Sequence, residues 1–256
     1  ATRKEFPQGI PAFGTDALRF TMASLATQGR DIKFDLGRIE GYRNFCNKLW
    51  NAARYVLMNT EGQDCGLSGK IELNAADRWI VSRLQVITVE VEAAFRDYRF
   101  DLAAQAIYSF VWHEYCDWYL ELSKVVLTTA DRRPGALRGT RRTLVQVLEA
   151  ALRLLHPVMP FITEEIWLRV APLAGRKGAT IMREPYPKPV KKQIDAKATG
   201  EMQWVMAVIA GVRNIRGEMD ISPGKPLPLL FQNGSASDKK SLENNRHYLS
   251  VLARAD

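Results

Sequence analysis

The sequence predicts a mainly α-helical protein, an up-and-down helical bundle followed by a small C-terminal α/β subdomain. Apolar residues recur at spacings of three and four along five or six long stretches, which is typical of amphipathic helices. Short polar loops join these stretches, so successive helices are expected to run antiparallel. After Ala171 prolines and basic residues become frequent, and a short strand candidate follows, which indicates a separate tail.

Local signals mark where each bundle helix begins and ends. Thr15 is a candidate N-cap for the first helix, and Gly29 ends it. Asn74 can cap the third helix, and the His156-Pro157 pair ends the fifth. The fourth helix carries aromatic residues on all sides, which favours a place at the centre of the bundle. The helices are expected over 16–28, 36–59, 75–97, 101–127 and 140–155, with a sixth beginning at Pro160 or Thr163.

The tail differs from the bundle in its amino-acid composition. Residues 172–192 hold several prolines and read as an extended linker, and a helix is expected over 196–216. Leu227 to Phe231 is a strand candidate, and Pro228 within it indicates an edge strand. A last helix is expected over 238–253.

Composition and charge favour binding over catalysis. The formal net charge of +8 favours a polyanionic partner, either a nucleic acid or an anionic membrane. No apolar run reaches membrane-spanning length, and no Gly-rich phosphate loop follows a strand. The adjacent Glu164 and Glu165 point in different directions and are poorly placed as an acid/base pair. No catalytic residue is therefore expected in this chain.

The cysteines indicate a reducing compartment. Three cysteines lie far apart without a Cys-x-x-Cys pair, which favours a cytoplasmic protein. His113 and Cys116 are one helical turn apart, but two further ligands with matching spacing are missing, so no metal site is expected. The chain starts at Ala1 without a methionine, and we expect it to be part of a longer protein. Nothing indicates a dimer seam, so a monomer is expected.

The second helix has an unusual polar face. Its segment 38–54, RIEGYRNFCNKLWNAAR, places asparagines and cations opposite an apolar stripe. Asparagine lowers helix propensity, so a solvated face alone does not account for three of them. Amide and guanidinium groups read base edges and hold phosphates, which indicates nucleic-acid recognition. Alternatively, the asparagines satisfy backbone groups where helices cross.

A second cationic segment lies ahead of the fifth helix. Residues 131–142, DRRPGALRGTRR, contain five arginines and are expected to form a loop that runs into the helix. The arginines could contact phosphates or form a solvated turn, and we favour the solvated turn.

Four motifs resemble one known family. DALRF, 16–20, resembles the helix that follows the catalytic domain in class I aminoacyl-tRNA synthetases. GRDIKFDLGRIEGYRNFCNKLWNAARYVLMN, 29–59, resembles the start of the anticodon-binding domain of bacterial valyl-tRNA synthetases. LHPVMPFITEEIW, 155–167, is similar to a run shared by the valyl, isoleucyl and leucyl enzymes. VRNIRGEMDISPGK, 212–225, resembles the region after the bundle in the valyl and isoleucyl enzymes. The resemblance covers essentially the whole chain in order.

The resemblance implies the C-terminal anticodon-binding portion of an enzyme that attaches valine to its tRNA with ATP. It implies a connector and DALR-type helix over 1–35, an anticodon-binding bundle over 36–185 and a small subdomain over 186–256. The signatures His-Ile-Gly-His and Lys-Met-Ser-Lys-Ser occur nowhere in the chain, so catalytic and editing domains are expected upstream and a coiled coil downstream. The implied partners are the anticodon loop of valine tRNA and those other domains. No cofactor is expected in the fragment, because ATP would bind the parent enzyme's catalytic domain.

We place RNA recognition on the polar face of the second helix. Its residues would read bases, the loop 61–64 and the helix end 121–124 would flank it, and Lys33 and Arg38 would hold the RNA backbone. The predicted RNA-binding residues are Lys33, Arg38, Arg43, Asn44, Asn47, Lys48, Asn51, Arg54, Gln63 and Lys124.

Arg19 and the tryptophans have structural and functional interpretations. Arg19 could bind the inside of the tRNA or pair with an acid such as Asp16, and we favour the structural role. Most tryptophans are expected in the core. Trp50 lies nearest the proposed face and remains a candidate for stacking on a base.

Three other readings compete with the valyl one. The chain could be the equivalent fragment of an isoleucyl-type enzyme, or a basic helical scaffold that binds protein. A membrane-surface protein comes last, because no helix has a clean Lys-rich face opposite Trp, Phe and Leu.

Overall fold

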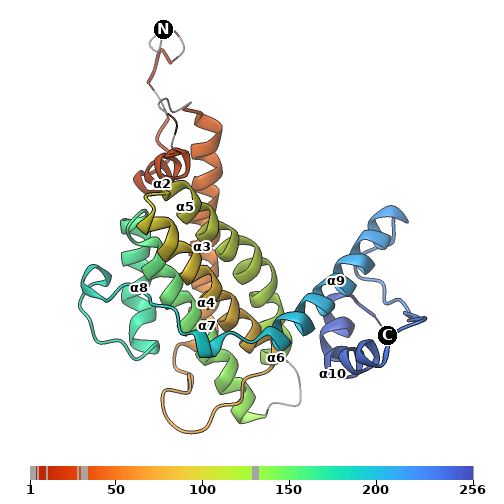
Figure 1. Ribbon diagram of the computed structural model, residues 1–256. Coiled ribbons are helices and arrows are strands. Elements are labelled where there is room, and N and C mark those ends of the chain that lie inside the picture. Colours follow the sequence, from red (N-terminus) through yellow and green to blue (C-terminus); the bar gives the residue numbers. More distant parts are fainter. Residues whose placement is uncertain are drawn as a thin grey trace.

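A computed structural model describes residues 4, 6–9, 11–27, 29, 34–128 and 133–255, and these are mainly helical. Figure 1 shows α2 to α8 packed side by side in one bundle, with α9 leaving it toward α10. The elements are α2 (Thr15–Leu25), α3 (Leu36–Thr60), α4 (Ala75–Arg96), α5 (Phe100–Ser109), η1 (Phe110–Tyr119), α6 (Leu120–Thr128), α7 (Pro134–Leu155), α8 (Pro160–Leu173), η2 (Ile181–Arg183), η3 (Lys191–Gln193), α9 (Ala196–Glu218) and α10 (Ala236–Leu252). The predicted mainly α-helical class is confirmed.

The α/β description of the tail is wrong for the described residues, which contain no β-strand. The expected strand over 227–231 is reduced to one parallel bridge between Leu227 and Ala255, with a 3.0 Å hydrogen bond from the Leu227 N–H to the Arg254 carbonyl. Pro226 and Pro228 have no N–H group to offer on the opposite edge of this segment, which is typical of an edge that pairs on one side only.

The expected starts of α2 and α7 differ from the structure in ways that their first residues explain. Thr15 is the first residue of α2, and Gly14 is the N-cap with φ of 96°, a backbone conformation that glycine adopts without strain. Helix α7 begins at Pro134, where a proline at the first position is favourable, and therefore includes most of the segment expected to be a loop. The cap at Asn74 is confirmed as a capping box with Asp77.

Helix α7, and not the aromatic helix, lies at the centre of the bundle. Its second half is buried on all sides: Leu144, Val145, Val147, Leu148, Ala151, Leu152, Leu154 and Leu155. The Glu149 carboxylate, also buried, accepts hydrogen bonds from Arg153 at 2.8 Å and from the Trp167 indole at 3.1 Å. Glu149 and Arg153 on this central helix are therefore paired within the fold.

The aromatic helix expected over 101–127 is one continuous helical stretch, and one side of it is exposed to solvent. Its middle part, η1, is a ten-residue π-helix between α5 and α6. Phe110, Tyr115 and Tyr119 are buried against the core, whereas His113 and Asp117 are exposed. This helical stretch therefore packs at the edge of the bundle, next to α3 and α4.

Helix α2 is fastened to the turn between α7 and α8. The Asp16 carboxylate accepts the Phe161 and Ile162 N–H groups at 3.3 and 2.7 Å, which caps the start of α8. The Arg19 guanidinium donates to the Pro157 and Val158 carbonyls at 3.0 and 2.9 Å. The favoured structural role of Arg19 is confirmed, although its partners are backbone carbonyls and not Asp16.

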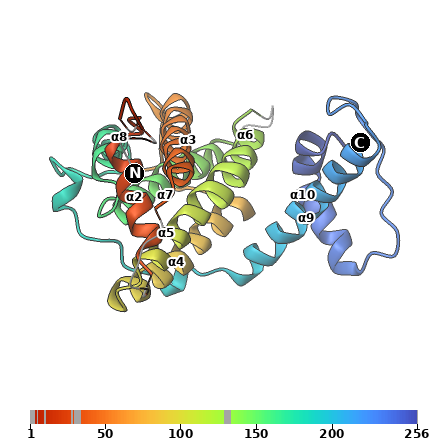
Figure 2. The same ribbon diagram turned by 90° about the horizontal axis from the view of Figure 1, so that it is seen from above.

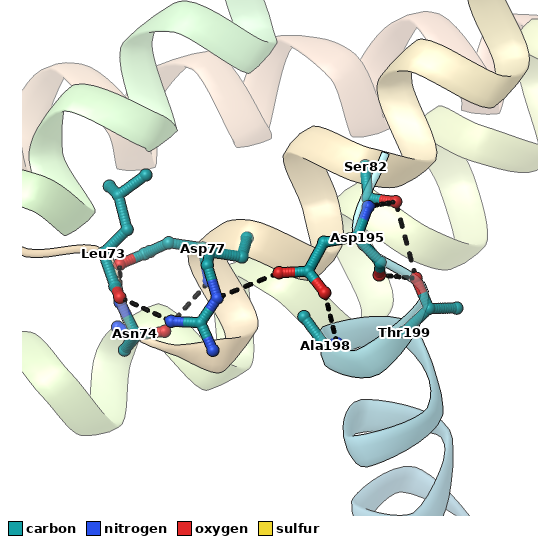
Figure 3. Close-up of polar contacts among 8 residues, drawn as sticks. Leu73, Asn74, Asp77, Ser82, Asp195, Ala198 and Thr199 are labelled. Carbon is teal, nitrogen blue, oxygen red and sulfur yellow. Dashed lines mark hydrogen bonds and ion pairs between the residues drawn. The ribbon is translucent and has the colours of Figure 1, made fainter. Parts of the chain in front are cut away.

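A polar seam attaches α9 to α4 (Figure 3). The Asp195 carboxylate caps α9 by accepting the Ala198 N–H at 2.8 Å, and it also accepts from the Arg78 guanidinium at 3.2 Å. The Asp195 N–H donates to the Ser82 hydroxyl at 2.9 Å. The start of α9 is thus placed by side chains of α4.

No helix in the described part of the chain is long and apolar enough to cross a membrane.

Candidate nucleic-acid interface

Helix α3 has two chemically different faces. Its buried stripe consists of Ile39, Phe45, Leu49, Ala52, Ala53 and Val56, which pack on the neighbouring bundle helices. Six residues on the other side are exposed to solvent and are called here the α3 outer face: Arg43, Asn44, Asn47, Trp50, Asn51 and Arg54. The structure therefore places five of the predicted RNA-binding residues together on one surface.

Trp50 completes a ridge along this face. Arg43, Asn47, Trp50 and Arg54 follow spacings of four, three and four, so each lies one turn from the next. The Trp50 side chain is 39% exposed, whereas Trp79 and Trp167 are buried in the core. An exposed indole between an amide and a guanidinium can stack an unpaired base. The sequence prediction did not include Trp50 among the binding residues, although the same spacing identifies it.

The three asparagines of the outer face are available to a ligand. Within the described residues the side chains of Asn44, Asn47 and Asn51 make no hydrogen bond, and α3 continues past them unbroken. Asn59 behaves differently, because its amide donates to the Tyr55 carbonyl at 2.8 Å. The alternative that the outer asparagines satisfy backbone groups at helix crossings is therefore not supported.

The cations of the outer face are largely uncommitted. Arg43 lies over the Phe13 ring, 5.8 Å from its centroid, and makes no ion pair with a described acid. Arg54 is exposed and likewise has no ion pair within the described residues. Arg38 is also exposed, but it lies 16 residues before Arg54, about 24 Å along the helix axis. It belongs to the opposite end of α3 from Arg54.

Lys48 is engaged within the fold, unlike Arg43 and Arg54. Its ammonium group pairs with the Asp117 carboxylate and lies 4.0 Å from the centroid of the Trp112 ring. The second Asp117 oxygen is 3.4 Å from His113 Nδ1. Lys48 is thus largely neutralised by η1, and Asp117, which the sequence prediction did not include, borders the outer face.

The predicted flanks are partly engaged. Lys124 pairs with Glu121 at 2.5 Å and lies 5.6 Å from the Tyr55 ring centroid, on the α6 side of α3. Gln63 is exposed in the turn after α3, and its N–H donates to the Thr60 carbonyl. Lys33 lies outside the described residues.

Burial keeps two titratable side chains of α3 in their neutral forms. It raises the pKa of the Cys46 thiol to about 11 and raises the pKa of the Tyr55 hydroxyl above its usual value. The positive charge of the α3 outer face comes from the Arg43 and Arg54 guanidinium groups.

One arginine of the arginine-rich segment supports the fold. Arg138 donates to the Lys70 carbonyl at 2.8 Å and to the Ser68 carbonyl, and it pairs with Asp64 at 2.7 Å. It thereby fastens the loop after α3 onto α7. The solvated-turn interpretation is therefore wrong for Arg138, while Arg133 is exposed and residues 131 and 132 lie outside the described part.

Comparisons with known proteins show the family to which this chain is similar. Residues 77–231 match the family described as the anticodon-binding domain of tRNA ligase. Valine–tRNA ligase of Coxiella burnetii (strain RSA 493 / Nine Mile phase I) is 53% identical over 253 residues, which are 99% of this chain and 28% of that protein. The chain thus spans just over a quarter of the curated relative it matches, and the resemblance to the valyl enzymes is confirmed.

A solved structure shows the same fold. The LeuRS chain in the ternary complex of Agrobacterium radiobacter K84 agnB2 LeuRS, tRNA and LeuAMS has a TM-score of 0.51 and 20% identity to this chain, and the match covers 72% of this chain and 21% of that one. Because the family match extends over more than half of the sequence, this chain belongs to the family of anticodon-binding domains of tRNA ligases.

Proposed function

We propose that this chain recognises the anticodon loop of valine tRNA as part of a valine–tRNA ligase, and that the α3 outer face is its reading surface. The high identity to a valine–tRNA ligase across nearly the whole chain supports the valine assignment over the isoleucyl alternative. The ATP-dependent attachment of valine would then belong to other domains of that enzyme. We further propose a cytoplasmic monomer, whose partners are this tRNA and those domains.

The observation that carries this proposal is the uncommitted polar chemistry of α3. Three amides without hydrogen bonds, two arginines without ion pairs and an exposed indole share one face, within the described residues. Bases in a hairpin loop are partly unstacked, so amides can reach their edges while an aromatic ring stacks on them. Guanidinium groups then hold the flanking phosphates, and the affinity falls as salt rises.

A binding experiment with paired variants tests the proposal. An anticodon stem-loop with the valine anticodon is titrated against the chain, beside a hairpin that differs only in the anticodon. The Arg43→Ala/Asn47→Ala variant should bind the native hairpin about tenfold more weakly, because it loses a phosphate contact and a base contact. The Trp50→Leu variant should lose the ~1–3 kcal/mol typical of one stacked base.

The matched control removes the same groups elsewhere. Arg246 and Asn214 are exposed side chains of the tail, so Arg246→Ala/Asn214→Ala deletes one guanidinium and one amide without touching α3. Its affinity should equal that of the unmodified chain. Equal affinity of the α3 variants and this control would contradict the proposal that α3 is the reading surface. Equal binding of both hairpins would contradict anticodon recognition.

A further inference from the structure

A large cleft lies outside the α3 outer face, between the bundle and the tail. It has a volume of about 1030 Å³, near the upper end of the ~300–1,000 Å³ range of ligand pockets. The start of α4, the end of α6 and the start of α7 form one wall, and α9 and α10 form the other. The polar seam of Asp195 with Arg78 and Ser82 closes the cleft at the α4–α9 junction (Figure 3).

The cleft carries uncommitted positive charge. Four cations line it, Arg78, Arg133, Lys197 and Lys240. Arg78 is paired with Asp195, and Arg133 is 3.7 Å from Glu72, whereas Lys197 and Lys240 have no ion pair or hydrogen bond within the described residues. The two lysines come from α9 and α10, so they present ammonium groups from two elements of one wall.

Both acids of the lining are already engaged. The Glu201 carboxylate accepts from the Asn245 amide at 2.8 Å. The Asp238 carboxylate caps α10 through Ser235 and accepts from the Trp204 indole at 2.9 Å. The donors in these hydrogen bonds are neutral, so they do not cancel the charges of the two carboxylates. The lining holds four cations and two carboxylates, a formal net charge of +2, which favours an anionic ligand.

The rest of the lining suits nucleotide bases. The Asn244 amide and the Trp204 ring line the cleft together with the lysines. Amides can bond base edges, aromatic rings stack on unpaired bases, and ammonium groups hold phosphates. A simple anion would use only the lysines, whereas an unpaired nucleotide would use all three kinds of group.

The cleft is next to the proposed reading surface. Helix α6 contacts α3 on one side, where the Tyr55 and Ser123 hydroxyls are 3.0 Å apart, and α10 on the other. Figure 2 shows α6 between these two helices. Val126 of α6 lines the cleft, whereas Lys124 of the same helix lies over Tyr55 of α3. An RNA strand that leaves the α3 outer face therefore has to pass only α6 before it enters the cleft.

We propose that this cleft is a second RNA site, which takes unpaired nucleotides of the same RNA that α3 reads. The inference rests on the proposed function, because the ligand of the cleft is taken to be the same RNA that is proposed to bind α3. It adds the tail to the RNA-binding surface, with Lys197 and Lys240 holding phosphates and Trp204 stacking a base.

Paired lysine variants test this site. The Lys197→Ala/Lys240→Ala variant is compared with Lys192→Ala/Lys239→Ala, which removes the same charge from exposed neighbouring positions outside the lining. Binding of a labelled anticodon stem-loop with a single-stranded extension is measured by fluorescence anisotropy across a salt series. Each lost phosphate contact should lower the slope of log affinity against log salt by about 0.7. The cleft variant should therefore lose about 1.4 of slope and on the order of tenfold in affinity, while its control keeps both.

The outcomes separate this proposal from the proposed function. Equal salt slopes for the cleft variant and its control overturn the proposal of a second RNA site in the cleft. They leave the proposal that α3 reads the anticodon unaffected. Weakening by the cleft variant alone, with no effect of the α3 variants, supports the cleft and overturns α3 as the reader. Displacement of the RNA by polyglutamate as readily as by a single-stranded oligonucleotide overturns the cleft, because it shows a general anion surface.

A crosslinking measurement locates the RNA directly. The extension carries 4-thiouridine, and crosslinked peptides are identified by mass spectrometry. Adducts in α9 or α10 that disappear in the Trp204→Leu variant support the site. Adducts confined to α3 overturn it.

Discussion

At the residue scale, one buried carboxylate joins three elements. Asp77 is fully buried at the start of α4, where it accepts hydrogen bonds from the Tyr119 hydroxyl at 2.8 Å, the Thr140 hydroxyl at 3.1 Å and the Asn74 N–H at 3.1 Å. Burial raises the pKa of this carboxyl from 3.8 to about 6, because the three hydrogen bonds only partly offset the loss of hydration. The folded protein therefore binds this proton more tightly than the unfolded chain does.

This carboxyl makes stability depend on pH in a defined direction. Between about pH 4 and pH 6 the folded state holds more protons at Asp77 than the unfolded state, so its contribution to the free energy of unfolding falls as pH rises. The total change is about 3 kcal/mol. We expect the stability of the unmodified chain relative to the Asp77→Asn variant to be greater at pH 4.5 than at pH 7. Urea unfolding of both proteins at several pH values checks this, and a difference that stays constant with pH would contradict it.

At the element scale, a close backbone approach fixes the segment after α3 on α7. The Glu72 N–H donates to the Gly135 carbonyl at 3.0 Å, and a Cβ on Gly139 would lie 2.0 Å from the Glu72 carbonyl oxygen. Only glycine permits this contact, and it carries the chain from α3 across α7 to the cap at Asn74.

Gly139→Ala should destabilise the fold by about 1–3 kcal/mol, because the new methyl group overpacks against backbone that cannot move freely. The helix propensity of alanine acts in the opposite direction and offsets only part of this cost. Gly211 of α9 is the matched control, because a Cβ there meets nothing within 4 Å. Gly211→Ala should stabilise the protein by about 0.5–1 kcal/mol. Thermal unfolding of both variants checks the prediction, and similar shifts in Tm would count against it.

Sequence periodicity located the helices well, since their apolar stripes and caps are local features. Asn74 marked the start of α4 through its own side chain. Contacts between distant segments were not accessible in this way. Nothing near Lys48 in the sequence indicates that Asp117 neutralises it, because the two lie 69 residues apart. The central place of α7 likewise depends on which helices surround it, and its arginines concealed that position. The place of Trp50 on the α3 outer face could have been predicted from spacing, because it continues the ridge of Arg43 and Asn47.

At the scale of the whole molecule, the tail is held to the bundle by few polar contacts. Asp195 both caps α9 and pairs with Arg78 of α4, and the Val190 N–H donates to the Gln85 side chain at 2.8 Å. The hydrogen bond from the Ala198 N–H, followed by that from Arg78, holds the pKa of Asp195 below its usual value. The stabilisation from Asp195 is thus present above pH 4 and is lost as the pH falls through its lowered pKa.

Asp195→Ala should therefore loosen the tail more than the bundle. Loss of an N-cap typically costs about 1 kcal/mol, and the Arg78 pair is lost with it. Hydrogen exchange at pH 7 should become faster in α9 and α10 while α3 and α7 keep their protection. Glu218→Ala, at the exposed end of α9, serves as the comparison. Equal acceleration across all helices would mean that bundle and tail open as one unit.

The fastening of α2 has a mechanical consequence. Asp16 holds the first turn of α8, and Arg19 holds the carbonyls at the end of α7, so one short helix grips both sides of a single turn. Tension transmitted through residues 11–14 would enter the protein at this turn and pass into the buried rod of α7. Charge-assisted hydrogen bonds would have to break before α2 could peel away. Helix α2 is therefore rigidly coupled to the turn between α7 and α8. A rotation at the start of α2 would rotate this turn with it.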